Sequence, residues 1–194
     1  MIFSSVFFMF VFLPVVLLAY YLVPQKLKNV VILISSLIFY AWGEPVYVVL
    51  MIFSIVYNYI AGIEIEYHRN AGKKGRMKTV FLMAVVVNLL VLGFFKYYGF
   101  LLQNLNHILP VDIPYRTLPL PIGISFYTFQ TLSYVIDVYR GNVDVQKNPI
   151  HFGTYISMFP QLIAGPIVRY ADVEKQLADR KISLVRFGDG TAWF

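Results

Sequence analysis

The chain has 194 residues, of which 59% are hydrophobic and 13% are charged, and its formal net charge is +6. Soluble domains carry about 25% charged residues, so this composition excludes an ordinary soluble protein and indicates an integral membrane protein in contact with the lipid bilayer. The 194 residues include no cysteine, which excludes disulfides, a thiolate nucleophile, thiol metal ligands and palmitoylation within them.

Apolar runs separated by polar or helix-breaking residues predict about five membrane spans, because a helix of ~20 apolar residues crosses a bilayer. The first run has no basic leader and no small-residue cleavage site, so we expect a retained span rather than a signal peptide. The second run is short unless it tilts or extends through Trp42. The expected spans are Ile2 to Val23, Val30 to Tyr40, Val46 to Ile63, Thr79 to Phe95 or on to Leu109, and Leu120 to Val138.

Basic residues predict which loops face the cytoplasm, because lysine and arginine in short loops stay on that side. Lys26 and Lys28 lie in the first loop, and five further basic residues lie between Arg69 and Lys78 in the third, whereas the second loop carries only Glu44. We therefore expect the odd loops inside and the N-terminus outside. The basic third loop is explained by topology and by attraction to anionic lipid, so no nucleic-acid partner is expected.

The fifth expected span carries a stripe of polar residues. At about 3.6 residues per turn, Tyr127, Gln130, Tyr134 and Asp137 fall on one face of a helix, and that face cannot point at lipid. Arg140 follows Asp137 at helical spacing, and an ion pair between them would lower the cost of a carboxylate near the membrane edge. Two interpretations remain open: the face lines a substrate tunnel, or it makes ordinary hydrogen bonds between helices.

The segment from Ile150 to Val168 is apolar but is interrupted by Pro160 and by the Gly165-Pro166 pair. Basic residues flank it on both sides, so we expect a re-entrant helical element that enters and leaves from the cytoplasm. Broken backbone at membrane depth is tolerated inside protein or beside a water-filled cavity. Asn148 and Pro149 are expected to supply the N-cap and first turn of its first helix.

Arg169 and the three histidines are the other candidates for chemistry. Arg169 follows the Gly165-Pro166 break, where its planar cation suits a donor or carrier phosphate, or else it is an interfacial arginine that reaches toward water. We expect His68 in a solvated basic loop, His107 at the outer end of a span and His151 in the first turn of the re-entrant helix. Each is expected to have a structural role.

Two motifs carry a resemblance. The run Ser125-Phe-Tyr-Thr-Phe-Gln-Thr-Leu-Ser-Tyr-Val-Ile-Asp-Val-Tyr-Arg-Gly141 and the run Phe159-Pro-Gln-Leu-Ile-Ala-Gly-Pro-Ile-Val-Arg-Tyr170 resemble the membrane-bound O-acyltransferase family. The likeness is closest to its bacterial alginate O-acetyltransferases, with the teichoic-acid D-alanylation membrane proteins as cousins. It covers essentially the whole chain, and the two motifs occur in the family's order and separation.

The resemblance implies O-acyl transfer in the bacterial inner membrane by a multi-pass protein, with O-acetylation of an exported polysaccharide such as alginate. It implies no bound cofactor or metal, an acyl donor (acetyl-CoA or a carrier-derived acyl group) as substrate on the cytoplasmic side, and an acyl-transfer partner on the outer side. The candidates for a donor or substrate tunnel are Gln130, Tyr134, Asp137, Arg140, Gly165, Pro166, Arg169 and Tyr170.

The family assigns its general base to a histidine in an apolar helix, and none of the three histidines here occupies such a place. Family members are also considerably longer. We therefore expect residues 1–194 to be a truncated, N-terminal part of one O-acyltransferase domain, without a separate soluble domain and inactive alone, with the histidine beyond Phe194. The alternatives are a non-catalytic membrane scaffold and a transporter fragment, although a transporter is expected to show an internal repeat and none is found.

Overall fold

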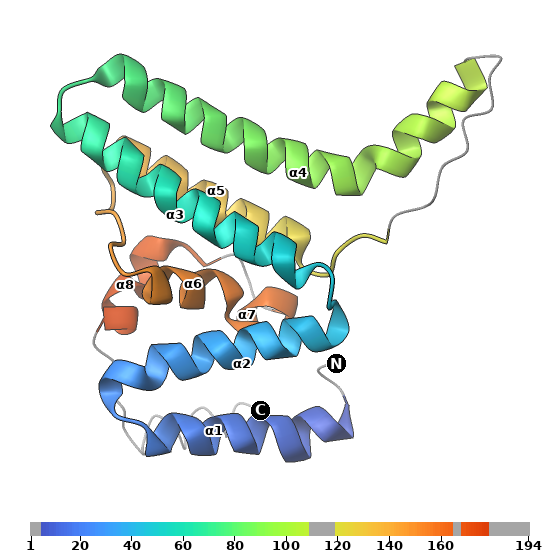
Figure 1. The fold of residues 1–194 in the computed structure, drawn as a ribbon, viewed down its shortest axis with the longest axis vertical. Helices are drawn as coiled ribbons and strands as arrows, with labels where there is room; N and C mark the ends of the chain where they lie inside the picture. The colour runs from blue at the N-terminus through green and yellow to red at the C-terminus, as the bar shows by residue number, and fades with distance from the viewer. Residues whose placement is uncertain (1–4, 109–118, 165–167, 179–194) are drawn as a thin grey trace.

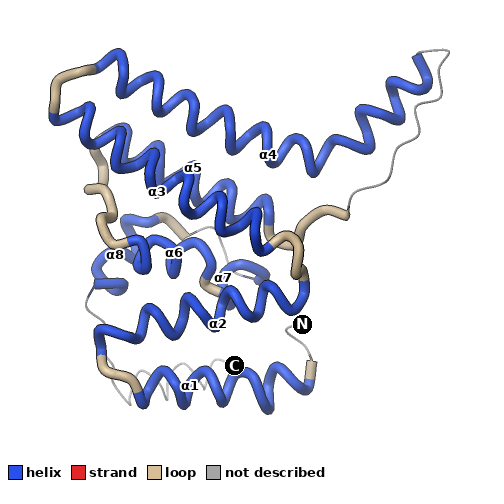
Figure 2. The backbone as a smooth tube through the Cα atoms, in the orientation of Figure 1, coloured by secondary structure: helices blue, strands red, loops and turns tan. Residues whose placement is uncertain are grey.

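The computed structural model describes residues 5–108, 119–164 and 168–178. Within these ranges all regular structure is helical, and Figure 2 shows helices joined by loops. Three helices are long and apolar enough to cross a membrane, namely Gln25–Gly43, Val48–Asn70 and Lys74–Ile108, and Phe8–Leu22 is a shorter apolar helix. The described fold is therefore compatible with a helical membrane protein, as the composition indicates.

The described elements are all helices. In chain order they are η1 (Phe8–Phe12, a π-helix), α1 (Leu13–Leu22), η2 (Gln25–Leu27), α2 (Lys28–Gly43), α3 (Val48–Asn70), α4 (Lys74–Ile108), α5 (Ile124–Arg140), α6 (Pro149–Ser157), α7 (Phe159–Ala164) and α8 (Tyr170–Ala178).

Several predicted boundaries are confirmed and others are wrong. The second helix does extend through Trp42, and the fourth follows the longer of its two predicted paths, to Ile108. The fifth begins at Ile124 rather than Leu120, because Gly123 takes a left-handed backbone conformation (φ +76°) that interrupts a helix. The first helix is described from Phe8, and its predicted start at Ile2 lies outside the described residues.

The helices lie roughly side by side in one stack (Figure 1). Helix α3 packs against both α4 and α5, and α2 packs against α1 and α6. The connections α1–α2, α3–α4 and α5–α6 lie together at the left end in Figure 1, and the α2–α3 turn lies at the other end. The loops rich in lysine and arginine therefore share one end of the stack, which is the arrangement that the loop charges predict.

The predicted re-entrant element is a broken helix. Asn148 caps α6, because its Oδ1 accepts hydrogen bonds from the backbone N–H groups of Ile150 (2.9 Å) and His151 (3.4 Å). The helix stops at Met158 and resumes as α7 at Phe159, since Pro160 has no N–H to donate and its ring clashes with a preceding carbonyl. The second predicted break, Gly165-Pro166, lies outside the described residues.

Helix α8 brings the chain back to the end at which α6 begins. It packs against α6 and α5, and the carbonyl oxygen of Leu177 accepts a hydrogen bond from Nδ2 of Asn29 at 2.8 Å. The end of α8 thus lies beside the α1–α2 connection. The start of α6 and the end of α8 therefore lie at the same end of the stack, while the re-entrant path through a membrane stays a prediction.

Candidate functional site

The polar stripe of α5 faces the interior, as its periodicity predicts. Tyr127, Gln130 and Tyr134 are at most 3% exposed, whereas Phe126 and Phe129 on the other side of the helix are 40% and 46% exposed. Phe126 and Phe129 therefore face outward, whereas the hydroxyl and amide groups of this helix are buried among other helices. Ile124, Leu132, Val135 and Val138 of α5 are buried with them. A buried polar face of this kind is expected for a helix that borders a polar interior.

Gln130 joins α5 to the broken helix. Its Nε2 donates a hydrogen bond to the carbonyl oxygen of Tyr155 in α6 at 2.8 Å. The hydroxyl of Tyr155 in turn donates to the carbonyl oxygen of Val168 at 2.9 Å, two residues before α8 begins. A single chain of contacts therefore holds α5, α6 and the approach to α8 together.

Tyr134 and Tyr170 meet in a tyrosine cluster, which we define as Tyr134, Tyr155 and Tyr170. The ring centroid of Tyr170 lies 5.2 Å from that of Tyr134 and 5.3 Å from that of Tyr155, edge to face in both pairs. The hydroxyl of Tyr134 accepts a hydrogen bond from the backbone N–H of Gln146 at 3.0 Å, and Nε2 of Gln146 donates to the hydroxyl of Tyr170 at 2.7 Å.

The cluster is a group of neutral hydrogen-bonding side chains. Burial, with a smaller contribution from the carboxylate of Glu174, raises the pKa of Tyr170 to about 12, so its hydroxyl is protonated at physiological pH. Tyrosine hydroxyls and glutamine amides bind and orient polar groups of a ligand. They do not provide a base that removes a proton near neutral pH.

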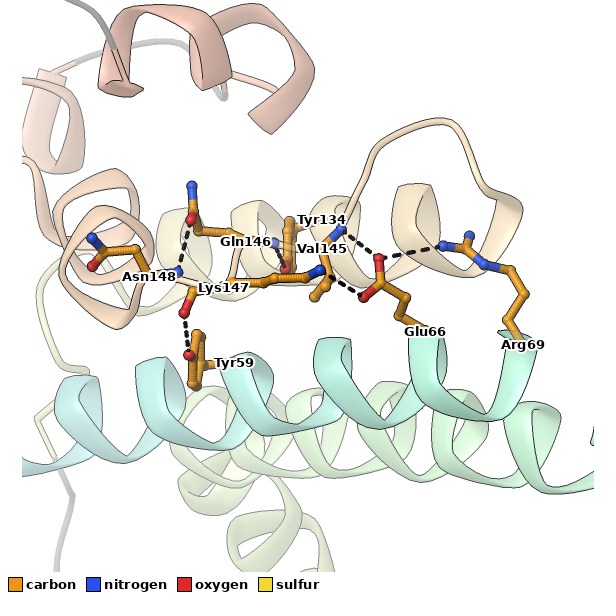
Figure 3. Close-up of polar contacts among 8 residues, drawn as sticks. All are labelled: Tyr59, Glu66, Arg69, Tyr134, Val145, Gln146, Lys147 and Asn148. Atoms are coloured by element: carbon orange, nitrogen blue, oxygen red, sulfur yellow. Dashed lines mark hydrogen bonds and ion pairs between the residues drawn. The ribbon is translucent and has the colours of Figure 1, made fainter. Parts of the chain in front are cut away.

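The connecting segment 141–148 holds Gln146 beside the cluster (Figure 3). The carboxylate of Glu66 lies 4.0 Å from both Nη2 of Arg69 and Nζ of Lys147. The hydroxyl of Tyr59 donates to the carbonyl oxygen of Lys147 at 2.7 Å. These contacts with α3 fix the segment, and so they determine where Gln146 meets Tyr134 and Tyr170.

A second buried polar group joins α3, α4 and α5, and we call it the amide cluster: Asn58, Asn88 and Thr131. Nδ2 of Asn88 donates to Oδ1 of Asn58 at 2.7 Å, and Nδ2 of Asn58 donates back to Oδ1 of Asn88 at 3.1 Å. The hydroxyl of Thr131 lies 3.3 Å from the same oxygen of Asn88. These residues are at most 5% exposed, so the cluster is a buried link between three helices.

Asp137, Arg140 and Arg169 make no hydrogen bond to the tyrosine cluster within the described chain, and the two other predicted site residues lie outside it. The predicted ion pair between Asp137 and Arg140 is wrong, because Oδ1 of Asp137 instead accepts a hydrogen bond from Asn142 at 3.2 Å and Arg140 is exposed at the end of α5. Arg169 is also exposed, just before α8. Gly165 and Pro166 lie outside the described residues.

The prediction that His68 lies in a solvated loop is wrong. His68 belongs to the last turn of α3, its side chain is 12% exposed, and its Nε2 lies 3.4 Å from a carboxylate oxygen of Glu64. His107 is exposed near the end of α4, and His151 is half-buried in the first turn of α6. Within the described chain, no group of three or more His, Cys, Asp or Glu side chains is placed to hold a metal ion.

Sequence reasoning missed Tyr155, Gln146 and the two asparagines. Asn58 and Asn88 did carry a signal, because each is an amide within an otherwise apolar run. Tyr155 carried a weaker signal. Gln130 bonds its backbone carbonyl, and the side-chain type of a residue does not predict such a contact. Gln146 carried none, because a polar residue in a connecting segment is expected by default.

Long apolar helices, a buried polar face and a broken helix define a membrane protein with a polar site between its helices. No family model matches the chain, and no solved structure matches it. Curated relatives do match. Over all of the chain it is 41% identical to a protein named probable alginate O-acetylase AlgI from Pseudomonas aeruginosa, and 39% identical to one of the same name from Azotobacter vinelandii.

A third relative carries a different name. Over 93% of the chain, 32% of residues are identical to a peptidoglycan O-acetyltransferase from Helicobacter pylori. The chain spans 38% of the Pseudomonas aeruginosa protein and 39% of each of the other two. These matches confirm the resemblance to bacterial O-acetyltransferases that the two motifs indicate.

Proposed function

We propose that residues 1–194 form part of a membrane O-acyltransferase that transfers acetyl groups to an exported polysaccharide. The observation that carries the proposal is the match over the whole chain to proteins named alginate O-acetylase. The name of the third relative also describes O-acetyl transfer, to peptidoglycan. O-acetyl transfer to a glycan is thus what the names have in common.

In this proposal the chain crosses the bacterial inner membrane about five times, with its N-terminus outside and the basic loops in the cytoplasm. The helices η1 and α1 form one short span, and α5 is the fifth. The acyl donor, acetyl-CoA or an acyl group from a carrier, reaches the protein from the cytoplasmic end. The acceptor and an acyl-transfer partner lie on the outer side.

On the buried face of α5, one residue, Tyr127, favours the tunnel interpretation more than the others do. Gln130 and Tyr134 already have partners within the protein, as ordinary bonding between helices requires. Tyr127 is different, because it is 1% exposed and its hydroxyl has no hydrogen-bond partner among the described residues. A buried hydroxyl without a partner costs free energy, and such groups call for a functional explanation. We therefore assign Tyr127 to the acyl-transfer path.

The tyrosine cluster would then be a wall that binds and orients the donor. The general base that an acyl transfer to a hydroxyl needs is expected in the part of the relatives that this chain does not span. Residues 1–194 would therefore contribute recognition, and the remaining part would contribute the proton transfer.

A chimera tests this function. Residues 1–194 replace the matching segment of the Pseudomonas aeruginosa relative, and the chimera is expressed in an alginate-producing strain that lacks its own alginate O-acetylase. We expect acetyl esters to return to the exported alginate, measured by NMR of the purified polymer, and none to return with residues 1–194 alone. A chimera that inserts in the membrane but transfers no acetyl group would contradict the proposal and favour a non-catalytic scaffold.

Tyr127→Phe in the same chimera separates a tunnel wall from a purely structural helix. Removing a hydroxyl that has no partner should leave stability unchanged or higher, so a role in folding alone predicts no loss of transfer. A role in the acyl path predicts a fall in acetyl content of about tenfold at equal protein level. Tyr97→Phe is the matched control, because Tyr97 is 49% exposed on α4.

A further inference from the structure

A polar cavity of about 350 Å³ lies at the end of the stack that carries the basic loops. It is formed by the α1–α2 connection and the start of α2, the first turn of α6 and the end of α8. Its polar lining includes Lys26, Lys28, Asn29, Asn148 and His151, and the lining contains no aspartate or glutamate among the described residues. The cavity is separate from the tyrosine cluster, since no residue of that cluster lines it.

Lys28 is the unusual member of this lining. It is only 9% exposed, and among the described residues no carboxylate lies within 4.0 Å of its ammonium group. Its Nζ lies 5.0 Å from the centre of the Tyr20 ring, which stabilises a cation only modestly. Lysine is almost never buried to this degree without an anionic partner. A bound anion would supply the partner that this part of the protein does not.

Asn29 places a second requirement on the bound ligand. It is 6% exposed, and its Nδ2 donates to the carbonyl oxygen of Leu177, but its Oδ1 has no hydrogen-bond partner among the described residues. That oxygen accepts hydrogen bonds and cannot donate them. The ligand should therefore carry a hydroxyl or an N–H group close to its negative charge.

The N-terminus of α6 contributes positive potential to the cavity, but it offers no backbone hydrogen bond at its capped positions. The backbone N–H groups of Ile150 and His151, in the first turn of this helix, already donate to Oδ1 of Asn148. The positive end of the helix nevertheless lies at the cavity wall and favours an anion. With Lys26 and Lys28, the wall thus presents three sources of positive potential, and its described lining contains no carboxylate.

We propose that this cavity binds a phosphate ester that also carries a hydroxyl or amide group. A phosphate with up to two negative charges matches two ammonium groups better than a single carboxylate does, and lysine binds phosphate as a point charge. The volume is within the range of small-molecule sites, about 300–1,000 Å³. Such an ester has two sources at this end of the molecule: the headgroup of an anionic lipid, or a soluble phosphate ester from the cytoplasm. The proposal does not depend on acyl transfer, and its test measures binding alone.

The full chain in nanodiscs provides the test. In discs of phosphatidylcholine alone, coenzyme A is titrated by calorimetry as the soluble ester, which carries phosphate, hydroxyl and amide groups. In a second arm, native mass spectrometry counts the phosphatidylglycerol molecules that the protein retains from mixed discs. We expect saturable binding in one arm, weakened about tenfold by Lys28→Met and restored by Lys28→Arg.

The matched control is Lys96→Met, which removes a lysine that also lies over a tyrosine ring, 5.7 Å from the centre of Tyr97, but on the exposed side of α4. It should change binding less than twofold. Binding of coenzyme A alone identifies a soluble ester, and retention of phosphatidylglycerol alone identifies a lipid headgroup. If neither ligand binds in a way that depends on Lys28, or if Lys96→Met weakens binding equally, the proposal is wrong. Circular dichroism and size-exclusion profiles show whether Lys28→Met folds, and Lys26→Met gives a second variant at an exposed position if it does not.

Discussion

Gly62 of α3 is the residue that allows Tyr134 to reach its position. A Cβ atom at Gly62 would lie 3.0 Å from both Cε1 and the hydroxyl oxygen of Tyr134, and 3.2 Å from a methyl carbon of Val145. Tyr134 is fully buried and packs against Phe152 with ring centroids 4.7 Å apart, so its ring has little room to move. We therefore predict that Gly62→Ala destabilises the protein by about 1–3 kcal/mol, the range for overpacked interiors.

Gly93→Ala is the control for this substitution. A Cβ at Gly93 meets no atom within 4 Å, so alanine there should be neutral or stabilise α4 by up to about 1 kcal/mol through helix propensity. Thermal unfolding in detergent compares the two variants, and hydrogen exchange at the Gln146 amide, which donates to Tyr134, reports the local change. Equal stability of the two variants would contradict the prediction and would show that Tyr134 can move away from an added Cβ at Gly62.

Residue-level prediction from the sequence succeeded where the polar and apolar periodicity was strong and failed where a helix continued beyond its apolar run. The burial of Gln130 and Tyr134 follows from helical spacing alone. The environment of His68 was missed because α3 continues to Asn70, beyond the end of its apolar run at Ile63. Glu64 with His68, and Glu66 with Arg69, form contacts at helical spacing that support this polar extension. The apolar pattern carries no information about such pairs.

At the scale of elements, the amide cluster should link α3 to α4 cooperatively. Asn58 and Asn88 exchange two hydrogen bonds, and Nδ2 of each also donates to a carbonyl oxygen of its own helix. Replacing one asparagine by leucine therefore leaves part of the buried hydrogen-bonding capacity of the other unpaired. We predict that each single variant is less stable than the protein, and that the double variant loses less stability than the two losses added together. The coupling should be about 0.6–1.7 kcal/mol, as for hydrogen bonds between membrane helices.

Denaturant unfolding of the four proteins in a double-mutant cycle gives this coupling. Asn104→Leu is the control, since Asn104 is exposed on α4 and its Nδ2 donates to a carbonyl of its own helix. Its coupling to Asn58→Leu should be zero within error. A coupling of zero between Asn58 and Asn88 as well would mean that the two amides find other partners when separated.

The broken helix shows which helix boundaries local sequence features can predict. Pro160 and the Asn148-Pro149 pair predicted both the break and the start of α6, because proline and capping effects are local. The start of α5 was wrong by four residues, since the apolar side chains before Gly123 fit a span but its left-handed backbone does not. The connecting segment 141–148 could not be predicted, because α3 fixes it through Tyr59 and Glu66, which are distant in sequence.

For the molecule as a whole, loop charge and helix packing agree on which connections lie at the same end of the stack. The loop α3–α4 and the connections α1–α2 and α5–α6 share one end of the stack, and the α2–α3 turn lies at the opposite end (Figure 1). The charge rule places the basic end in the cytoplasm. The sequence therefore predicted which connections share an end of the stack, whereas the side of the membrane that each end faces stays a prediction.

Cysteine labelling tests this orientation directly, because the 194 residues contain no native cysteine. Val46 is 75% exposed in the α2–α3 turn, and Lys73 is exposed between α3 and α4. We predict that Val46→Cys reacts with a membrane-impermeant maleimide in bacteria whose outer membrane alone is permeabilised, and that Lys73→Cys reacts only after the inner membrane is opened. Reaction of Lys73→Cys in the first condition would reverse the proposed orientation, and with it the side from which the donor and the phosphate ester reach the protein.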